Sequence, residues 1–162
     1  MKDIKFLVLD VDGVLTDGGM YYTESGDEFK KFNAKDGLAI RRLTKAGIPI
    51  GIISHGHLSK LINKRAELLG IKHVFVGMGM KKLDILTKWC EELKIDLQDV
   101  AYIGDDINDL EVLQAVGVSA CPDDAVLGVK DITHHILQRN GGNACVREFI
   151  DMYFAEIMNS GF

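Results

Sequence analysis

Residues 5–17 read Lys5-Phe-Leu-Val-Leu-Asp10-Val-Asp12-Gly-Val-Leu-Thr-Asp17. The stretch before Asp10 is almost continuously apolar, as in a strand that is buried on both faces of a sheet. It ends in two carboxylates, Asp10 and Asp12, that are separated by one residue and followed by a glycine. A buried strand that ends in charged side chains is typical of a parallel sheet whose functional groups lie at its carboxyl edge.

The same alternation of apolar strands and amphipathic helices continues along the chain. Strands are predicted at 5–10, 48–53, 73–76, 100–103 and 118–121, and helices at 37–45, 58–69, 82–93, 108–115, 124–130 and 144–158. Asp36 is the expected N-cap of the first helix. Residues 20–23 and 28–33 predict a β-hairpin. Together these elements predict a doubly wound α/β fold with a parallel sheet, in a single domain over residues 1–162.

Composition limits the class of protein. The 162 residues are 47% hydrophobic and 27% charged, the proportions of a globular domain. A net charge of -5 argues against a nucleic-acid partner. No apolar run approaches the roughly 20 residues of a membrane span, so no membrane partner is expected. The three cysteines, Cys90, Cys121 and Cys145, form no CxxC pair, which predicts a reduced, cytoplasmic protein.

Polar segments follow four of the predicted strands. They are the Asp10–Asp17 segment, Ser54-His-Gly-His57, Gly77-Met-Gly-Met-Lys-Lys82 and Gly104-Asp-Asp-Ile-Asn-Asp109. Because the carboxyl ends of parallel strands meet at one edge, we expect these segments to converge. Converging carboxylates need a cation between them, and an all-oxygen ligand set favours Mg²⁺ before Ca²⁺.

These residue types suit phosphoryl transfer. An aspartate at a strand end can attack phosphorus. A second carboxylic acid two residues later can protonate the leaving oxygen and then activate water. A serine and a lysine at neighbouring strand ends can hold the phosphoryl oxygens.

The motifs resemble those of a known family. Asp10-Val-Asp-Gly-Val-Leu-Thr16, Ser54 and Gly104-Asp-Asp-Ile-Asn-Asp109 resemble, in order and placement, the signature of the haloacid-dehalogenase (HAD) phosphatases. The hairpin and the late Gly141-Gly-Asn-Ala-Cys-Val-Arg147 further resemble the capless members of that superfamily, typified by the 3-deoxy-D-manno-octulosonate 8-phosphate (KDO8P) phosphatases, with the 2-keto-3-deoxynononate 9-phosphate phosphatases as close relatives. The resemblance spans essentially the whole chain. It implies a Rossmann-like core with a small β-hairpin insertion and no cap domain.

The resemblance implies catalytic and metal-binding roles. Asp10 would be the nucleophile and Asp12 the general acid/base. Asp10, the backbone carbonyl of Asp12 and the side chain of Asp105 would bind Mg²⁺. Asp106 and Asp109 would support the metal and its waters.

The resemblance also implies a phosphate site made by Ser54 and a lysine after the third strand. The family's distance from that lysine to the Gly104 motif favours Lys82. Counting forward from the preceding glycine favours Lys81 instead.

The implied substrate is a phosphorylated keto-deoxy sugar acid, with a place in lipopolysaccharide biosynthesis. The implied assembly is a homotetramer in which the hairpins form a central barrel and a neighbouring subunit covers each active site. His55, His57, Arg65 and Arg147 are the candidate substrate contacts. The loop Ser54-His-Gly-His57 is one residue longer than in the relatives, so a nononate 9-phosphate of sialic acid biosynthesis stays open as the substrate.

Two alternatives of another class remain. A degenerate domain of this fold could serve as a non-catalytic oligomerisation or regulatory module, but Asp10, Asp12, Lys82 and Asp105 are all retained. An Asp-phosphorylated signalling domain could share the sheet, but an acid/base residue such as Asp12 would speed its dephosphorylation.

Overall fold

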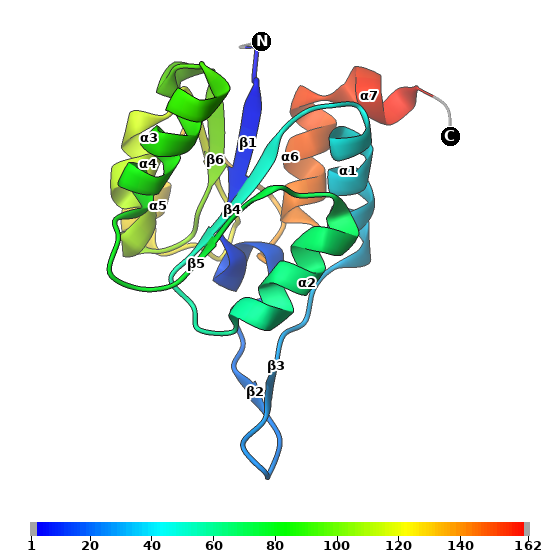
Figure 1. Cartoon of the computed structure of the whole chain (residues 1–162), viewed down its shortest axis with the longest axis vertical. Helices are drawn as coiled ribbons and strands as arrows, with labels where there is room; N and C mark the ends of the chain where they lie inside the picture. The colour runs from blue at the N-terminus through cyan, green and yellow to red at the C-terminus, as the bar shows by residue number, and fades with distance from the viewer. Residues whose placement is uncertain (1–2, 161–162) are drawn as a thin grey trace.

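The computed structural model describes residues 3–160, and its centre is a parallel sheet of six strands in the order β5-β4-β1-β6-β7-β8 (Figure 1). The strands are β1 (Phe6–Leu9), β4 (Ile50–Ser54), β5 (His73–Val76), β6 (Val100–Ile103), β7 (Val118–Cys121) and β8 (His135–Ile136). Every neighbouring pair runs in parallel. The predicted α/β sheet is therefore confirmed.

Helices cover both faces of the sheet (Figure 1). One side carries α1 (Ala34–Lys45), α2 (Ser59–Leu69), α6 (Cys145–Tyr153) and α7 (Ala155–Asn159), and the other carries α3 (Lys82–Leu93), α4 (Leu110–Ala115) and α5 (Leu127–Lys130). Short helical turns are η1 (Val11–Leu15), η2 (Leu97–Asp99) and η3 (Ile107–Asp109). Between residues 3 and 160, none of the helices is long and apolar enough to cross a membrane.

Strand β1 belongs to both hydrophobic cores, because successive side chains of a strand point to opposite faces. Leu7 and Leu9 lie in the core under α1, α2 and α6, whereas Phe6 and Val8 lie in the core under α3 and α4. All four side chains are fully buried. This double burial explains why the stretch that precedes Asp10 is continuously apolar.

The strand order creates a crevice at the carboxyl end of β1. The chain passes from β1 to β4 and β5 on one side and then returns to β6 on the other side. In doubly wound sheets, ligands bind where the order reverses in this way. The segments that follow β1, β4 and β6 therefore share one end of the molecule.

The predicted hairpin is present but shorter than expected. Its strands are β2 (Tyr21–Tyr22) and β3 (Glu28–Phe29), which pair antiparallel and project beyond the carboxyl edge of the sheet (Figure 1). An isolated bridge between Thr16 and Phe32 joins its base to the body of the protein. Within residues 3–160 no other insertion is large enough to form a separate domain.

The predicted capping role of Asp36 was wrong. Helix α1 begins at Ala34, where the side chain of Asn33 accepts a hydrogen bond from the N–H of Lys35 at 2.8 Å. Asn caps helices as well as Asp does. Asp36 is 1% exposed in the first turn, and its Oδ1 accepts the N–H of Arg147 at 2.7 Å. It therefore caps the N-terminus of α6, a helix that lies far away in the sequence.

The predicted helix over 144–158 is divided at Phe154. The backbone of Phe154 leaves the helical region, with φ -127° and ψ 32°, and helix α7 begins at the next residue. The side chain of Phe154 is buried in the core under α1 and α6. The change of direction thus keeps this aromatic ring inside the protein.

Candidate active site

A cavity of about 280 Å³ lies at the carboxyl ends of β1, β4 and β6. Three segments line it: Asp10 and Asp12 after β1, residues 54–56 at the end of β4, and residues 105–108 after β6. These are the segments that the strand pattern predicts to converge. The third strand contributes through Lys82 at the start of α3, described next.

Lys82 lies between two buried carboxylates. Its Nζ is 3.0 Å from Oδ2 of Asp10 and 2.8 Å from Oδ1 of Asp109. Burial lowers the pKa of Lys82 and the two carboxylates raise it, and the net direction is upward, so the ammonium stays charged. Lys81 instead points to the surface, where it pairs with Glu111 at 2.8 Å. Of the two lysines that the sequence leaves open, Lys82 is the one at the site.

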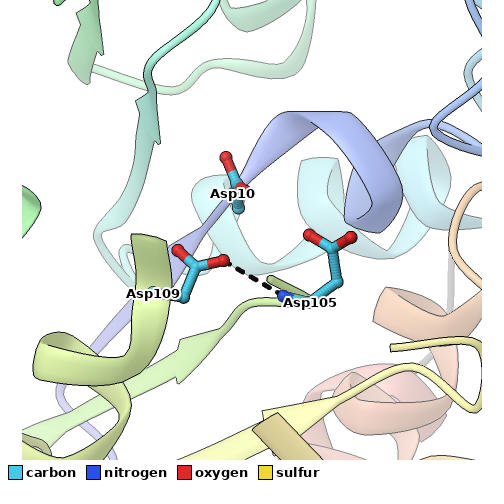
Figure 2. Close-up of side chains that lie close together, drawn as sticks. All are labelled: Asp10, Asp105 and Asp109. Atoms are coloured by element: carbon cyan, nitrogen blue, oxygen red, sulfur yellow. Dashed lines mark hydrogen bonds between the residues drawn. The ribbon is translucent and has the colours of Figure 1, made fainter. Parts of the chain in front are cut away.

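Asp109 connects Lys82 to the loop after β6. Its Oδ1 also accepts the hydroxyl of Tyr102 at 2.6 Å, and its Oδ2 accepts the N–H of Asp105 at 3.1 Å, drawn as a dashed line in Figure 2. Sequence reasoning did not single out Tyr102. One feature of the sequence could have identified it: Tyr102 lies in a strand predicted to be buried on both faces. A buried hydroxyl needs a hydrogen-bond partner, so a polar group was to be expected beside it. Below, the inner cluster means Asp10, Lys82, Tyr102 and Asp109.

The carboxylates of Asp10, Asp105 and Asp109 converge, each with an oxygen within 4.8 Å of the others (Figure 2). Burial and the charges of Asp109 and Asp106 raise the pKa of Asp105 to about 7. Burial and Asp109 also raise the pKa of Asp10, against the effect of Lys82. Oδ1 of Asp105 is buried and has no hydrogen-bond partner. An unpartnered oxygen within an all-oxygen cluster fits a hard divalent cation.

Gly13 allows η1 to pack directly against this cluster. Its φ of +84° lies in the left-handed region that favours glycine. A Cβ at this position would lie only 2.0 Å from Oδ2 of Asp105. Any side chain here would displace the Asp105 carboxylate.

Asp12 lies at the edge of the cavity and makes a different set of contacts. Its side chain is 39% exposed, and its Oδ1 is 2.6 Å from Nζ of Lys30. Lys30 is also 3.5 Å from Oε1 of Glu28, whose Oε2 is 3.0 Å from Nε2 of His57. Burial lowers the pKa of Lys30, but the contacts with Asp12 and Glu28 raise it overall. Below, the outer cluster means Asp12, Glu28, Lys30 and His57.

Lys30 and Glu28 were missed by sequence reasoning. Both belong to the hairpin, where charged residues are frequent and most side chains are exposed. Nothing in the local pattern distinguishes them from their neighbour Lys31.

The loop after β4 has two side chains at the cavity. The hydroxyl of Ser54 is buried and accepts the N–H of Gly56 at 3.0 Å. His55 also lines the cavity, and its Nε2 lies 3.0 Å from the carbonyl oxygen of Met80. His57 lies farther out, with a side chain that is 74% exposed.

The two arginines predicted to contact substrate do not line this cavity. The guanidinium of Arg65 lies over the ring of Phe32, 5.3 Å from its centroid. Arg147 donates from Nε to both oxygens of Asp151 on α6, at 2.8 and 2.9 Å. Asp106 does line the cavity, and its Oδ1 accepts the N–H of Ile107 at 2.7 Å.

Comparisons with known proteins identify the family of this chain. The family model of the haloacid dehalogenase-like hydrolases matches residues 35–117. The KDO8P phosphatase of Haemophilus influenzae is 38% identical over 152 residues, which cover 94% of this chain and 83% of that protein.

Solved structures of phosphatases are also similar. The KDO8P phosphatase from Yersinia pestis matches with a TM-score of 0.90 and 36% identity, covering 96% of this chain and 83% of the other. The enzyme from Moraxella catarrhalis, in complex with a magnesium ion, a phosphate ion and KDO, matches with a TM-score of 0.89 and 32% identity, covering 98% and 94%. The resemblance noted in the sequence and the expected class of enzyme are confirmed. This chain belongs to the haloacid dehalogenase-like hydrolase family, together with its KDO8P phosphatase relatives.

Proposed function

We propose that this chain is a Mg²⁺-dependent phosphatase that hydrolyses KDO8P through a phosphorylated aspartate. The observation that carries the proposal is the buried ion pair of Asp10 with Lys82 beside the unpartnered oxygen of Asp105. Relatives 38% identical act on KDO8P, and a structure 32% identical holds magnesium, phosphate and KDO.

Three groups of the chain would hold the metal. They are the carboxylates of Asp10 and Asp105 and the backbone carbonyl of Asp12, with Asp106 and Asp109 in support. The unpartnered Oδ1 of Asp105 supports this assignment. When bound, Mg²⁺ would offset the negative charge that the phosphoryl group adds to these carboxylates.

The remaining chemistry is assigned to side chains. The carboxylate of Asp10 attacks phosphorus, and the bond from phosphorus to the sugar oxygen breaks. Asp12 gives a proton to that leaving oxygen and later takes a proton from the water that hydrolyses the aspartyl-phosphate. The second step releases inorganic phosphate and restores Asp10 as a carboxylate.

Lys82 and Ser54 would bind the phosphoryl oxygens. The ammonium of Lys82 is already fixed by Asp10 and Asp109, so it needs no reorganisation when charge develops. The oxygen of Ser54 accepts the N–H of Gly56, which leaves its O–H able to donate to a phosphoryl oxygen.

The sugar acid would be recognised by His55 on the cavity wall and by His57 at the edge. Arg65 and Arg147 do not line the cavity of their own subunit, so we assign their substrate contacts to the site of a neighbouring subunit. Lipopolysaccharide biosynthesis is the corresponding pathway. The departure of the loop from Ser54 to His57 keeps a nononate 9-phosphate of the sialic acid type as the second candidate substrate.

We infer a homotetramer built through the hairpins. Three large apolar side chains of the hairpin are at least half exposed: Met20, Tyr22 and Phe29. Light scattering would then give about four times the chain mass of 17.9 kDa. The cysteines Cys90, Cys121 and Cys145 are all free and buried, which supports the proposed cytoplasmic location.

The test is phosphate release from a panel with Mg²⁺ and, separately, with a chelator. The panel contains KDO8P, 2-keto-3-deoxynononate 9-phosphate, N-acetylneuraminate 9-phosphate and hexose phosphates. We expect the highest kcat/KM with KDO8P, and no release when the chelator is present. Absence of release from every compound by the folded, Mg²⁺-supplied protein would overturn the proposal and favour a non-catalytic module.

A further inference from the structure

The hairpin places two charged side chains against the edge of the cavity. The side chains of Lys30 and Glu28 are only 4% and 5% exposed, although the hairpin itself projects from the sheet. Nζ of Lys30 is 2.6 Å from Oδ1 of Asp12 and 3.5 Å from Oε1 of Glu28. A short, part-buried contact of this kind is stronger and more directional than an exposed ion pair.

The contact with Lys30 determines which oxygen of Asp12 is available. Oδ1 is taken by the ammonium. Oδ2 points toward the loop after β4, since a Cβ on Gly56 would lie 3.3 Å from Oδ2 of Asp12 and 3.1 Å from Oγ of Ser54. Asp12, Ser54 and Gly56 all line the cavity. The free oxygen of Asp12 therefore lies beside the serine proposed to bind the phosphoryl group.

We propose that Lys30 is a positioning residue that holds the Asp12 carboxylate with Oδ2 toward the leaving oxygen, and that Glu28 holds Lys30 in turn. This inference rests on the proposed function, because Asp12 has a proton to transfer only in a phosphatase. Proton transfer requires the heavy atoms to approach within roughly 2.6–3.2 Å. A carboxylate that is free to rotate reaches that geometry less often, in both half-reactions.

The hairpin that carries Lys30 is held by contacts from three parts of the chain. Thr16 and Phe32 form the bridge at the base of the hairpin, and the ring of Phe32 packs against the core. The guanidinium of Arg65 on α2 covers that ring. His57, in the loop after β4, contacts Glu28, which is the second partner of Lys30. These contacts give the hairpin a fixed place relative to η1, which a positioning role requires.

The experiment compares Lys30→Met with its matched control, Lys31→Met. Lys31 is the next residue along the chain, but its side chain is 60% exposed and contacts Asp17 instead. Both variants are assayed with KDO8P and Mg²⁺ for kcat and KM, and both are melted. We expect Lys30→Met to lower kcat roughly 10- to 100-fold and to change KM by less than about threefold. The loss in kcat is smaller than the full contribution of an acid/base group, because Asp12 itself is still present. Lys31→Met should leave both constants within about twofold.

Two further variants separate positioning from a structural effect. Lys30→Arg keeps the positive charge and should recover part of the kcat lost in Lys30→Met. Glu28→Gln keeps Lys30 but removes one of its partners, so we expect a smaller fall in kcat than in Lys30→Met. If Lys30→Met does not melt cooperatively, it is not folded, and the kcat of Glu28→Gln tests the inference in its place. A kcat of Glu28→Gln equal to that of the wild type then overturns the inference.

The outcomes also distinguish this inference from the proposed function. An active wild-type enzyme with an unchanged kcat in Lys30→Met overturns the positioning role alone. A rise in KM at constant kcat also overturns it, because Lys30 would then bind substrate rather than orient Asp12. A wild-type protein that releases phosphate from no compound of the panel overturns the proposed function instead.

Discussion

At the inner cluster, the side chains of Lys82 and Asp109 are 1% and 0% exposed, whereas at the outer cluster those of Asp12 and His57 are 39% and 74% exposed. The inner cluster comes from the end of β1, strand β6, the turn η3 and the first residue of α3, which pack against the hydrophobic cores. The outer cluster depends on a hairpin outside the sheet (Figure 1). We therefore expect Lys82→Met at the inner cluster to lower stability and activity together, and His57→Ala at the exposed side of the outer cluster to change activity with little effect on stability.

The largest effect is expected from Lys82→Met at the inner cluster. The change removes a donor to the phosphoryl group and leaves the buried carboxylates of Asp10 and Asp109 without their counterion. We expect kcat to fall by about 10²- to 10³-fold, as when a preorganised donor to developing charge is lost. We also expect a lower melting temperature, because an unpaired buried charge is costly. Lys81→Met is the matched control, and equal kcat values in the two variants would contradict the assignment.

The next largest effect is expected on stability alone, at Asp36, a buried carboxylate outside both clusters. Burial raises the pKa of Asp36 from its ordinary value of 3.8 to about 6. The protonated side chain therefore favours the folded state, and this stabilisation is complete below the unfolded-state pKa and is lost as pH rises through about 6.

Asp36→Asn stays neutral and lacks this pH dependence. Between about pH 4 and pH 7, the unfolding free energy of the wild type should fall by about 2 kcal/mol relative to that of the variant. Urea unfolding at several pH values measures the difference. If the difference in unfolding free energy between the two proteins does not change with pH, burial of Asp36 does not raise its pKa. Because Asp36 lies outside both clusters, kcat at pH 7 should be the same in both proteins.

A smaller effect on stability is expected from Tyr102→Phe at the inner cluster. The change removes the hydroxyl that donates to Asp109 at 2.6 Å and leaves the rest of the ring in place. Loss of a buried hydrogen bond to a charged group should lower the unfolding free energy by about 1.5–3 kcal/mol. Tyr22→Phe, at a residue that is 59% exposed, is the control. Indistinguishable unfolding curves for the two variants would contradict the structural role of Tyr102.

The smallest effect is expected from His57→Ala at the outer cluster. His57 contacts Glu28 from an exposed position, and exposed ion pairs contribute about 0–1 kcal/mol. We expect kcat within about threefold of wild type, an unchanged melting temperature and a modest rise in KM, because His57 is proposed to contact the sugar acid. Steady-state assays with KDO8P check this, and an unchanged KM would contradict that contact.

The two clusters also differ in how far the sequence predicts them. Asp10, Asp105 and Asp109 each follow a buried apolar strand, and the strand pattern alone brings them to one edge of the sheet. The choice between Lys81 and Lys82 could not be made locally, because adjacent residues at a helix start differ only in the direction they face. Packing resolves it, since Lys82 is 2% exposed.

Contacts between distant segments could not be predicted from local patterns. Asp12 meets Lys30 because the hairpin folds back over η1. Asp36 caps α6 because α1 and α6 pack side by side on one face of the sheet. Periodicity reports which face of an element is buried, but it does not report which neighbour that face meets.

The most direct test of the account asks whether Asp10 carries the phosphoryl group. The enzyme is mixed with KDO8P and Mg²⁺, quenched with acid during turnover, digested, and its peptides are weighed by mass spectrometry. If Asp10 is the nucleophile, the peptide containing Asp10 gains the mass of one phosphoryl group, and Asp10→Asn neither gains it nor releases phosphate. Turnover with the Asp10 peptide unmodified at all times, together with full activity in Asp10→Asn, would rule out Asp10 as the nucleophile.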